Sequence, residues 1–163
     1  MRTLIALVVV FIAAYPVAAD NRPDDQRALR GISEGRILWD VTLGDPGALL
    51  ARLQVIEQTY RDLVRQDVAP RMLFAFRGGA VRLLARDIDR FDLEAVAEVQ
   101  AVQAKLAALE GLEGVSRIEA CSIAAGRADL TAADLIDPAV MVGNTFVTAA
   151  AYAQRGYAKI RID

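Results

Sequence analysis

The chain has 163 residues, with 19 basic and 21 acidic side chains, a formal net charge of −2, no histidine and one cysteine, Cys121. This balance, without basic clusters interleaved with aromatic residues, argues against a nucleic-acid partner. The lack of histidine excludes an imidazole base and a histidine metal ligand, the single cysteine excludes a disulfide within the chain, and we expect neither a metal nor another cofactor.

Residues 1–19 have the pattern of a cleavable signal peptide. Arg2 gives a basic start, positions 4–14 form an unbroken apolar run, and positions 17–19 are residues of the kind that a signal peptidase needs. We expect cleavage after Ala19 and a periplasmic or secreted mature protein. Because the apolar run is shorter than the roughly 20 residues that span a bilayer, a retained anchor is the weaker alternative and we expect no stable membrane insertion.

The rest of the chain divides into an arm and one domain. Residues 20–34 begin with a polar, proline-containing stretch that has no apolar period, which is typical of a flexible N-terminal arm. Residues 35–163 are long enough to bury a core of their own and predict a single α/β domain.

Within this domain, short apolar runs bounded by glycine or proline alternate with stretches whose apolar residues recur every three or four positions. The first such stretch begins with Asp45 as a helix cap and Pro46 in the first turn. Asp40 is unusual inside the apolar run before it, and its side chain is expected to reach a neighbouring loop or subunit. Strands are expected at 36–42, 71–76, 114–120, 138–143 and 157–162, and helices at 46–66, 80–85, 93–110, 122–127 and 145–155.

This alternation predicts an α/β fold of three layers, in which a five-stranded, mainly parallel sheet has helices on both faces. Ligands of such sheets bind at the carboxyl edge, where the loops from strand to helix meet. Three loops are expected there: residues 78–79, 121–122 and 143–145. Cys121 lies in the middle one.

Cys121 is the candidate catalytic residue because it joins a strand to a helix that begins at Ser122. Unpaired N–H groups and the positive end of the helix dipole favour a thiolate over a thiol at such a position. A lone cysteine is also often a small buried hydrophobe, or pairs with another chain. The position at the carboxyl edge favours chemistry over packing.

Residues on the same edge are candidate ligand contacts, and each also has a purely structural interpretation. The two glycines suit a tight turn, Asn144 and Thr145 suit helix capping, and Arg127 suits a solvated surface position. A closer backbone approach, hydrogen bonds to an anion and a lowered thiol pKa are the functional alternatives. The candidates are Gly78, Gly79, Ser122, Arg127, Asn144 and Thr145.

Several segments resemble one family. Residues 114–121 (Gly-Val-Ser-Arg-Ile-Glu-Ala-Cys), the strand Pro-Ala-Val-Met-Val at 138–142 and the terminal Gly-Tyr-Ala-Lys-Ile at 156–160 look like the second half of DsrE/DsrF-like (YchN-like) sulfur-relay proteins. Residues 76–81 resemble the loop after the second strand of that family. The similarity extends over residues 35–163.

The resemblance implies a five-stranded α/β fold, assembly into homotrimers or hexamers, and a cysteine that accepts sulfur as a persulfide. Cys121 matches that cysteine. Two departures are visible: Arg77 stands where related sequences often have histidine, and the predicted export differs from the cytoplasmic location of the well-described members.

Two functions therefore stay open. The chain is expected to be either a periplasmic sulfur carrier that accepts and transfers sulfane sulfur on Cys121, or a noncatalytic oligomeric binding or scaffold protein that keeps only the fold. As the chain has no second cysteine to resolve an intermediate, a transfer reaction needs a donor or acceptor protein or a small thiol as partner.

Overall fold

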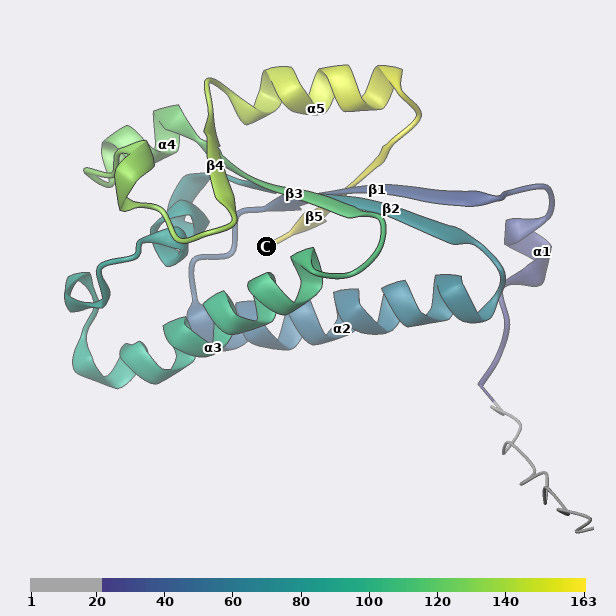
Figure 1. The fold of residues 1–163 in the computed structure, drawn as a ribbon, viewed down its shortest axis with the longest axis horizontal. Helices are drawn as coiled ribbons and strands as arrows, with labels where there is room; N and C mark the ends of the chain where they lie inside the picture. Colours follow the sequence, from purple (N-terminus) through teal and green to yellow (C-terminus); the bar gives the residue numbers. More distant parts are fainter. Residues whose placement is uncertain (1–21) are drawn as a thin grey trace, which may run out of the picture.

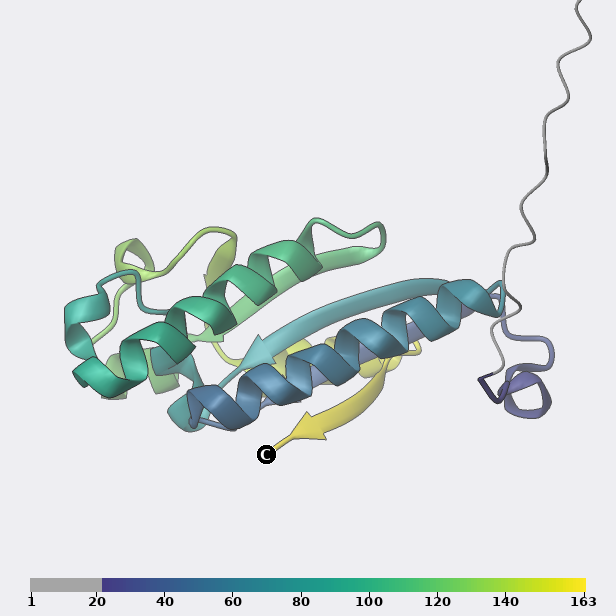
Figure 2. The ribbon, with the colours of Figure 1, turned by 90° about the horizontal axis from the view of Figure 1, so that it is seen from below.

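The computed structural model describes residues 22–163, and the predicted signal peptide lies outside these residues. The described chain forms three layers (Figure 1): two long helices, α2 (Pro46–Arg65) and α3 (Leu93–Glu110), lie on one face of a sheet, and α5 (Thr145–Gln154) lies on the other. Seen from below, α2 and α3 lie side by side across the sheet (Figure 2).

The sheet has five strands in the order β4-β3-β2-β1-β5, and all neighbours are parallel. The predicted fold class, a three-layer α/β fold with helices on both faces, is confirmed. Since every strand ends at the same edge, the loops after β2, β3 and β4 converge, as the sequence predicts. The strands are β1 (Glu34–Val41), β2 (Ala69–Phe76), β3 (Val115–Cys121), β4 (Ala139–Val142) and β5 (Ala158–Ile162).

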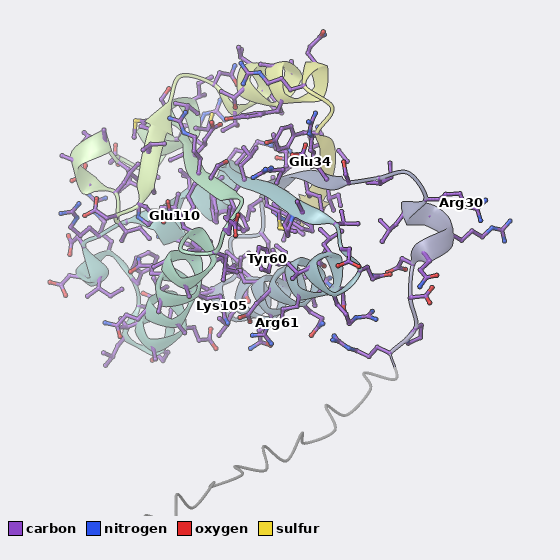
Figure 3. The ribbon with its side chains drawn as sticks, turned by 45° about the vertical axis from the view of Figure 1, so that its right-hand side comes forward. Arg30, Glu34, Tyr60, Arg61, Lys105 and Glu110 are labelled. Atoms are coloured by element: carbon purple, nitrogen blue, oxygen red, sulfur yellow. The ribbon has the colours of Figure 1, made fainter. Side chains whose placement is uncertain are left out.

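The face below the sheet contains the main core. In α2, the carboxylate of Asp45 accepts a hydrogen bond from the Ala48 N–H at 2.7 Å, and Pro46 occupies the first turn, as predicted. Apolar side chains of both helices pack against the sheet. Lys105 of α3 lies on the same side of the sheet as Tyr60 and Arg61 of α2 (Figure 3), and its Nζ is 3.0 Å from a carboxylate oxygen of Glu57 of α2. The fully buried residues of the two helices are Leu49, Leu53, Ile56, Val99, Val102, Leu106 and Leu109.

The upper face of the sheet is covered by α5. Leu38, Leu73 and Ala75 form a second, smaller buried cluster, and Tyr152 and Tyr157 pack against it. Asn144 is the cap of α5, because its side chain accepts a hydrogen bond from the Phe146 N–H at 2.9 Å. The predicted cap is confirmed, and it fixes the start of α5 beside the end of β3.

The predicted elements are present, with shifted ends. β1 and β2 each begin two residues earlier than predicted, because Glu34 pairs with Ala69 and Gly35 with Pro70 in a register that no local pattern reveals. β3 begins one residue later than predicted and includes Cys121, and β4 lacks its two predicted end residues. The predicted turn at 80–85 is a 3₁₀ helix, η1 (Gly78–Leu84), and the region expected to be irregular contains another, η2 (Ile88–Arg90).

The predicted arm contacts the domain. It contains one helical turn, α1 (Gln26–Leu29), and the chain before it lies along the end of α2. Arg65 donates a hydrogen bond to the Pro23 carbonyl at 3.0 Å, and Arg22 lies 3.0 Å from Asp62. These contacts join residues 22 and 23 to α2.

Two short helices complete the carboxyl edge. They are α4 (Ser122–Arg127) and η3 (Ala132–Asp134). Thr131 and Asp134 form a capping box at η3, since the Thr131 N–H and hydroxyl both donate to the Asp134 carboxylate, at 2.7 and 2.6 Å. Among residues 22–163, no helix has the length and apolar character needed to cross a membrane.

Candidate functional site

Cys121 is the last residue of β3 and the N-cap of α4. Its backbone is extended (φ −67°, ψ 118°), so the chain turns from strand into helix at this residue. Only 5% of Cys121 is exposed, but it reaches a pocket at the carboxyl edge of the sheet. Both sequence interpretations describe part of the result: the cysteine is buried, and its side chain also has an opening beside it.

Two helix starts surround the sulfur of Cys121. Burial raises the pKa of the thiol, but hydrogen bonds to the thiolate from the backbone N–H groups of Thr145, Ala124 and Ile123, and from the Thr145 hydroxyl, outweigh it. The pKa of Cys121 therefore lies below the ordinary value of a cysteine. The amides of Ala124 and Ile123 belong to the first turn of α4 and that of Thr145 to the first turn of α5, which agrees with the predicted role of helix starts.

The Thr145 hydroxyl points to an anionic sulfur. Thr145 is 2% exposed, and its hydroxyl has no conventional hydrogen-bond partner within the described chain. A neutral thiol is a weak acceptor, whereas a thiolate accepts strongly. The hydroxyl therefore gains its full partner only when Cys121 is ionised or carries an anionic sulfur.

Thr145→Val is expected to raise the pKa of Cys121, because the valine keeps the backbone N–H and removes the hydroxyl. At neutral pH the rate of alkylation by iodoacetamide should fall roughly threefold to tenfold. The measurement is the alkylation rate from pH 5 to 10. The wild-type midpoint should lie below that of an ordinary cysteine, about 8.5, so that the thiolate is lost only as pH falls through the lower folded value.

Thr145→Ser keeps a hydroxyl and should restore a low midpoint. The matched control is Thr148→Val, whose hydroxyl donates to the Thr145 carbonyl instead, at 3.2 Å, and which should leave the midpoint in place. A wild-type midpoint at or above that of the unfolded protein would contradict the assignment of these donors to the thiolate.

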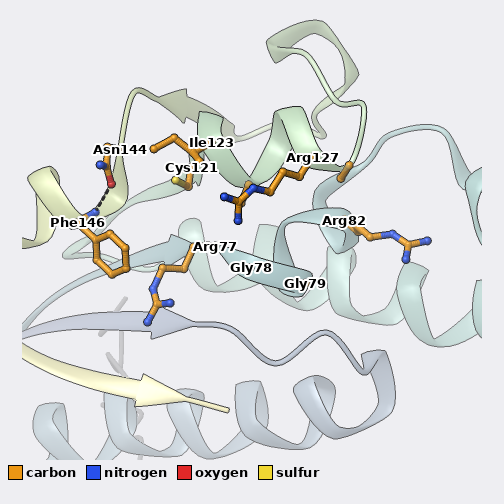
Figure 4. Close-up of a pocket in the computed structure, with 11 residues that line it drawn as sticks. Arg77, Gly78, Gly79, Arg82, Cys121, Ile123, Arg127, Asn144 and Phe146 are labelled. Atoms are coloured by element: carbon orange, nitrogen blue, oxygen red, sulfur yellow. Dashed lines mark hydrogen bonds between the residues drawn. The ribbon is translucent and has the colours of Figure 1, made fainter.

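The pocket beside Cys121 has a volume of about 520 Å³ and opens between α4, η1 and the start of α5 (Figure 4). Its wall combines cationic and apolar side chains with the backbone of the loop after β2. This size and lining are typical of a small-molecule site. The lining residues are Arg77, Gly78, Gly79, Arg82, Cys121, Ile123, Ala124, Arg127, Ala128, Asn144 and Phe146.

Arg77 is held in the pocket by Asp40. Its Nε and Nη2 donate to the two carboxylate oxygens at 2.7 and 2.8 Å, and its guanidinium lies 4.9 Å from the ring centre of Phe146. The hydrogen bond and charge of Asp40 raise the pKa of Arg77, as does the charge of a Cys121 thiolate. Asp40, unusual in its strand, thus reaches the loop after β2, and Arg77 supplies a positive charge near the sulfur.

The structure brings most of the predicted site residues together. Gly78, Gly79, Arg127 and Asn144 line the pocket with Cys121. Two do not line it: Thr145 lies behind the sulfur, and the Ser122 hydroxyl donates to the Gly143 carbonyl at 2.7 Å, which joins the start of α4 to the loop after β4. Gly78 has a φ of +57°, which is consistent with the tight turn that the double glycine predicts.

Other pocket residues were not candidates from the sequence. Arg82 lies in η1, and Ile123 and Phe146 lie in the first turns of α4 and α5. Ile123 is 51% exposed and Phe146 is 60% exposed. An apolar residue in the first turn that lies off the buried face of its helix is the sequence pattern that could have indicated these two pocket residues. Nothing local distinguishes Arg82 from a solvated arginine.

Glu119 is a buried carboxylate that the alternation of β3 does not reveal. It is 2% exposed, its Oε1 accepts a hydrogen bond from the Tyr152 hydroxyl at 3.3 Å, and its Oε2 has no partner within the described residues. Burial, and then the charge of Glu119, raise the pKa of Tyr152. Glu119 pairs with Ala75 and Ala75 with Asp40, so both carboxylates lie on the face that α5 covers.

The sequence matches no protein-family model and no curated protein. Among solved structures, the chain is similar to the protein of unknown function MTH1491 from Methanobacterium thermoautotrophicum, with a TM-score of 0.61 and 20% identity over 79% of this chain and 100% of that one. It is also similar to the YchN protein from E. coli, with a TM-score of 0.47 and 14% identity over 78% of this chain and 99% of that one.

The similarity to MTH1491 shows that the two chains have the same fold. At this level of identity a shared fold carries no activity across, and the chemistry has to be argued from Cys121 and its surroundings.

Proposed function

We propose that the protein carries sulfane sulfur as a persulfide on Cys121. The observation that carries this proposal is the placement of one sulfur at two helix starts, with a lowered pKa and an adjacent pocket. Helix-start amides stabilise an anion, and a cysteine persulfide is an anion near neutral pH like the thiolate that precedes it. The resemblance of residues 114–121 to the sulfur-relay family points to the same chemistry.

Two displacements make up the reaction. The Cys121 thiolate attacks the outer sulfur of a donor R–S–SH, a new S–S bond forms as the donor's S–S bond breaks, and R–S⁻ leaves with the electron pair of the broken bond. An acceptor thiolate then attacks the outer sulfur of the Cys121 persulfide, and Cys121 leaves as a thiolate. No net oxidation occurs. Because the chain has one cysteine, the acceptor thiol belongs to another molecule.

Intact-mass spectrometry tests this function. After incubation with inorganic polysulfide and removal of the excess, the wild-type protein should gain the mass of one sulfur atom, and dithiothreitol should remove it. Cys121→Ser should gain none. A wild-type thiol that gains no sulfur under native conditions, yet does so after unfolding in urea, would favour the alternative of a noncatalytic scaffold, which the 5% exposure of Cys121 also fits.

Export and self-association complete the proposal. The signal-peptide pattern supports a periplasmic or secreted protein, in which case the N-terminus of the mature chain should be Asp20 by mass. Exposed apolar residues outside the pocket, such as Val140 of β4 and Val147 of α5, support a homotrimer or hexamer. Light scattering that gives the mass of one chain would contradict the oligomer.

A further inference from the structure

The pocket beside Cys121 is cationic. Three arginines line it, Arg77, Arg82 and Arg127, and no acidic side chain does. The bidentate contact with Asp40 compensates the charge of Arg77. Arg82 and Arg127 are both exposed, and within residues 22–163 neither has an ion pair or a side-chain hydrogen bond. Both guanidinium groups therefore carry uncompensated charge, and that of Arg127 points into the pocket toward Cys121, whereas that of Arg82 points away from Cys121 (Figure 4).

A second pocket adjoins the first and shares these two arginines. It has a volume of about 350 Å³ and includes Arg90 and Phe91 in its wall, with Asp129 as its acidic residue. Arg90 has its own partners, the Ala128 carbonyl at 3.5 Å and the Asp87 carboxylate at 3.9 Å. Arg82 and Arg127 thus lie between two hollows, one of which contains the sulfur.

We infer that the sulfur donor is a small organic persulfide that carries a carboxylate or another anionic group, that Arg127 binds this group while the persulfide lies at Cys121, and that the charge of Arg82 attracts it to the pocket. The inference rests on the proposed function and names its substrate class. Planar guanidinium groups bind carboxylates through paired hydrogen bonds. Ile123 and Phe146 supply apolar contact for the carbon part of such a molecule.

The same charges assist the transfer itself. Cleavage of the donor S–S bond places a negative charge on the leaving R–S⁻, which forms in the pocket that the arginines line. The persulfide that remains on Cys121 stays at the amides of Thr145, Ala124 and Ile123. A neutral or cationic donor has no anionic group for Arg127, and binding it leaves the positive charge of the pocket uncompensated.

Stable disulfides test the charge preference at the same sulfur. The probes are oxidised glutathione, which is anionic, bis(2-hydroxyethyl) disulfide, which is neutral, and cystamine, which is cationic. Each forms a mixed disulfide with Cys121 and releases one thiolate, and intact mass follows the rate. In the wild-type protein, raising the salt concentration should slow oxidised glutathione and leave the neutral probe nearly unchanged.

The decisive variant is Arg82→Gln/Arg127→Gln, and its matched control is Arg52→Gln, an exposed arginine of α2 that lines neither pocket. The rate with oxidised glutathione divided by the rate with the neutral probe should fall about tenfold in the double variant. Arg52→Gln should keep the wild-type ratio.

Different failures have different meanings. If the ratio of the rates with oxidised glutathione and with the neutral probe does not change in the double variant, the donor is not selected by its negative charge. The same holds if the wild-type rate with oxidised glutathione is independent of salt. Either result contradicts the anionic donor and leaves the proposed persulfide carrier untouched. A protein that reacts with none of the three probes while folded, and with all of them in urea, overturns the proposed function itself. A preference for cystamine in the wild-type protein overturns the donor class.

Discussion

Gly114→Ala is expected to destabilise the domain by at least about 4 kcal/mol and to leave little folded protein. Gly114 has a φ of +83°, where a side chain is strained, and a Cβ added there would lie 2.0 Å from the Pro70 carbonyl oxygen. That atom belongs to the backbone of β2 and cannot move aside as a flexible side chain can. The Gly114 carbonyl also accepts a hydrogen bond from the Met72 N–H at 2.8 Å, so any shift separates β3 from β2.

Gly156→Ala is the matched control for this prediction. Its φ is +82°, but the nearest atom to an added Cβ is a guanidinium nitrogen of Arg36 at 3.5 Å, at the end of a flexible side chain. Gly156→Ala should therefore lower the free energy of unfolding by only about 1 to 2 kcal/mol, which is the cost of placing a residue with a side chain in this backbone conformation. Urea denaturation of both variants measures the difference. Equal losses would show that the contact with Pro70 adds nothing to the strain.

Most of the fold can be predicted from sequence patterns that span only a few residues. The apolar period of Leu49, Leu53 and Ile56, the proline in the first turn of α2 and the glycines at strand ends are all read within a few residues, and they predict the alternation that defines the sheet. The position of Cys121 follows from the same information, because a strand followed at once by a helix needs only its own sequence to be recognised.

The contents of the pocket depend on contacts between distant residues. Arg77 bonds to Asp40, 37 positions away, and this pairing depends on the register of β1 against β2. The burial of Glu119 depends on α5, which covers its strand from later in the chain. The alternation of polar and apolar residues within β3 therefore cannot predict that Glu119 is buried. Arg82 and Arg127 line one pocket because η1 and α4 are adjacent at the carboxyl edge, and this adjacency depends on the order of the strands.

Asp40→Ala is expected to destabilise the protein by about 2 to 4 kcal/mol, because it leaves the guanidinium of Arg77 without its carboxylate in a mostly buried position. Asp40 is 4% exposed and the Arg77 side chain is 20% exposed. Because the Arg77 guanidinium keeps some contact with solvent, we expect a smaller loss of stability than for a fully buried ion pair. Arg77→Met should cost a similar amount, since it leaves the Asp40 carboxylate with Lys159 alone, at 3.8 Å.

The two variants should have opposite effects on Cys121. Arg77→Met removes a positive charge near the sulfur and keeps the negative charge of Asp40, so the midpoint of the alkylation profile should move to higher pH. Asp40→Ala removes the negative charge and keeps Arg77, so the midpoint should move to lower pH. Denaturation in urea and iodoacetamide alkylation between pH 5 and 10 measure the two effects separately.

The sign of the shift separates electrostatics from structural damage. Both variants weaken the fold, and loosening alone would expose Cys121 and move both midpoints up, toward the value of an unfolded cysteine. Opposite shifts at similar losses of stability can arise only if the charges of Asp40 and Arg77 act on the thiolate. The double variant Asp40→Ala/Arg77→Met removes both charges, so it should regain part of the stability and return the midpoint toward the wild-type value.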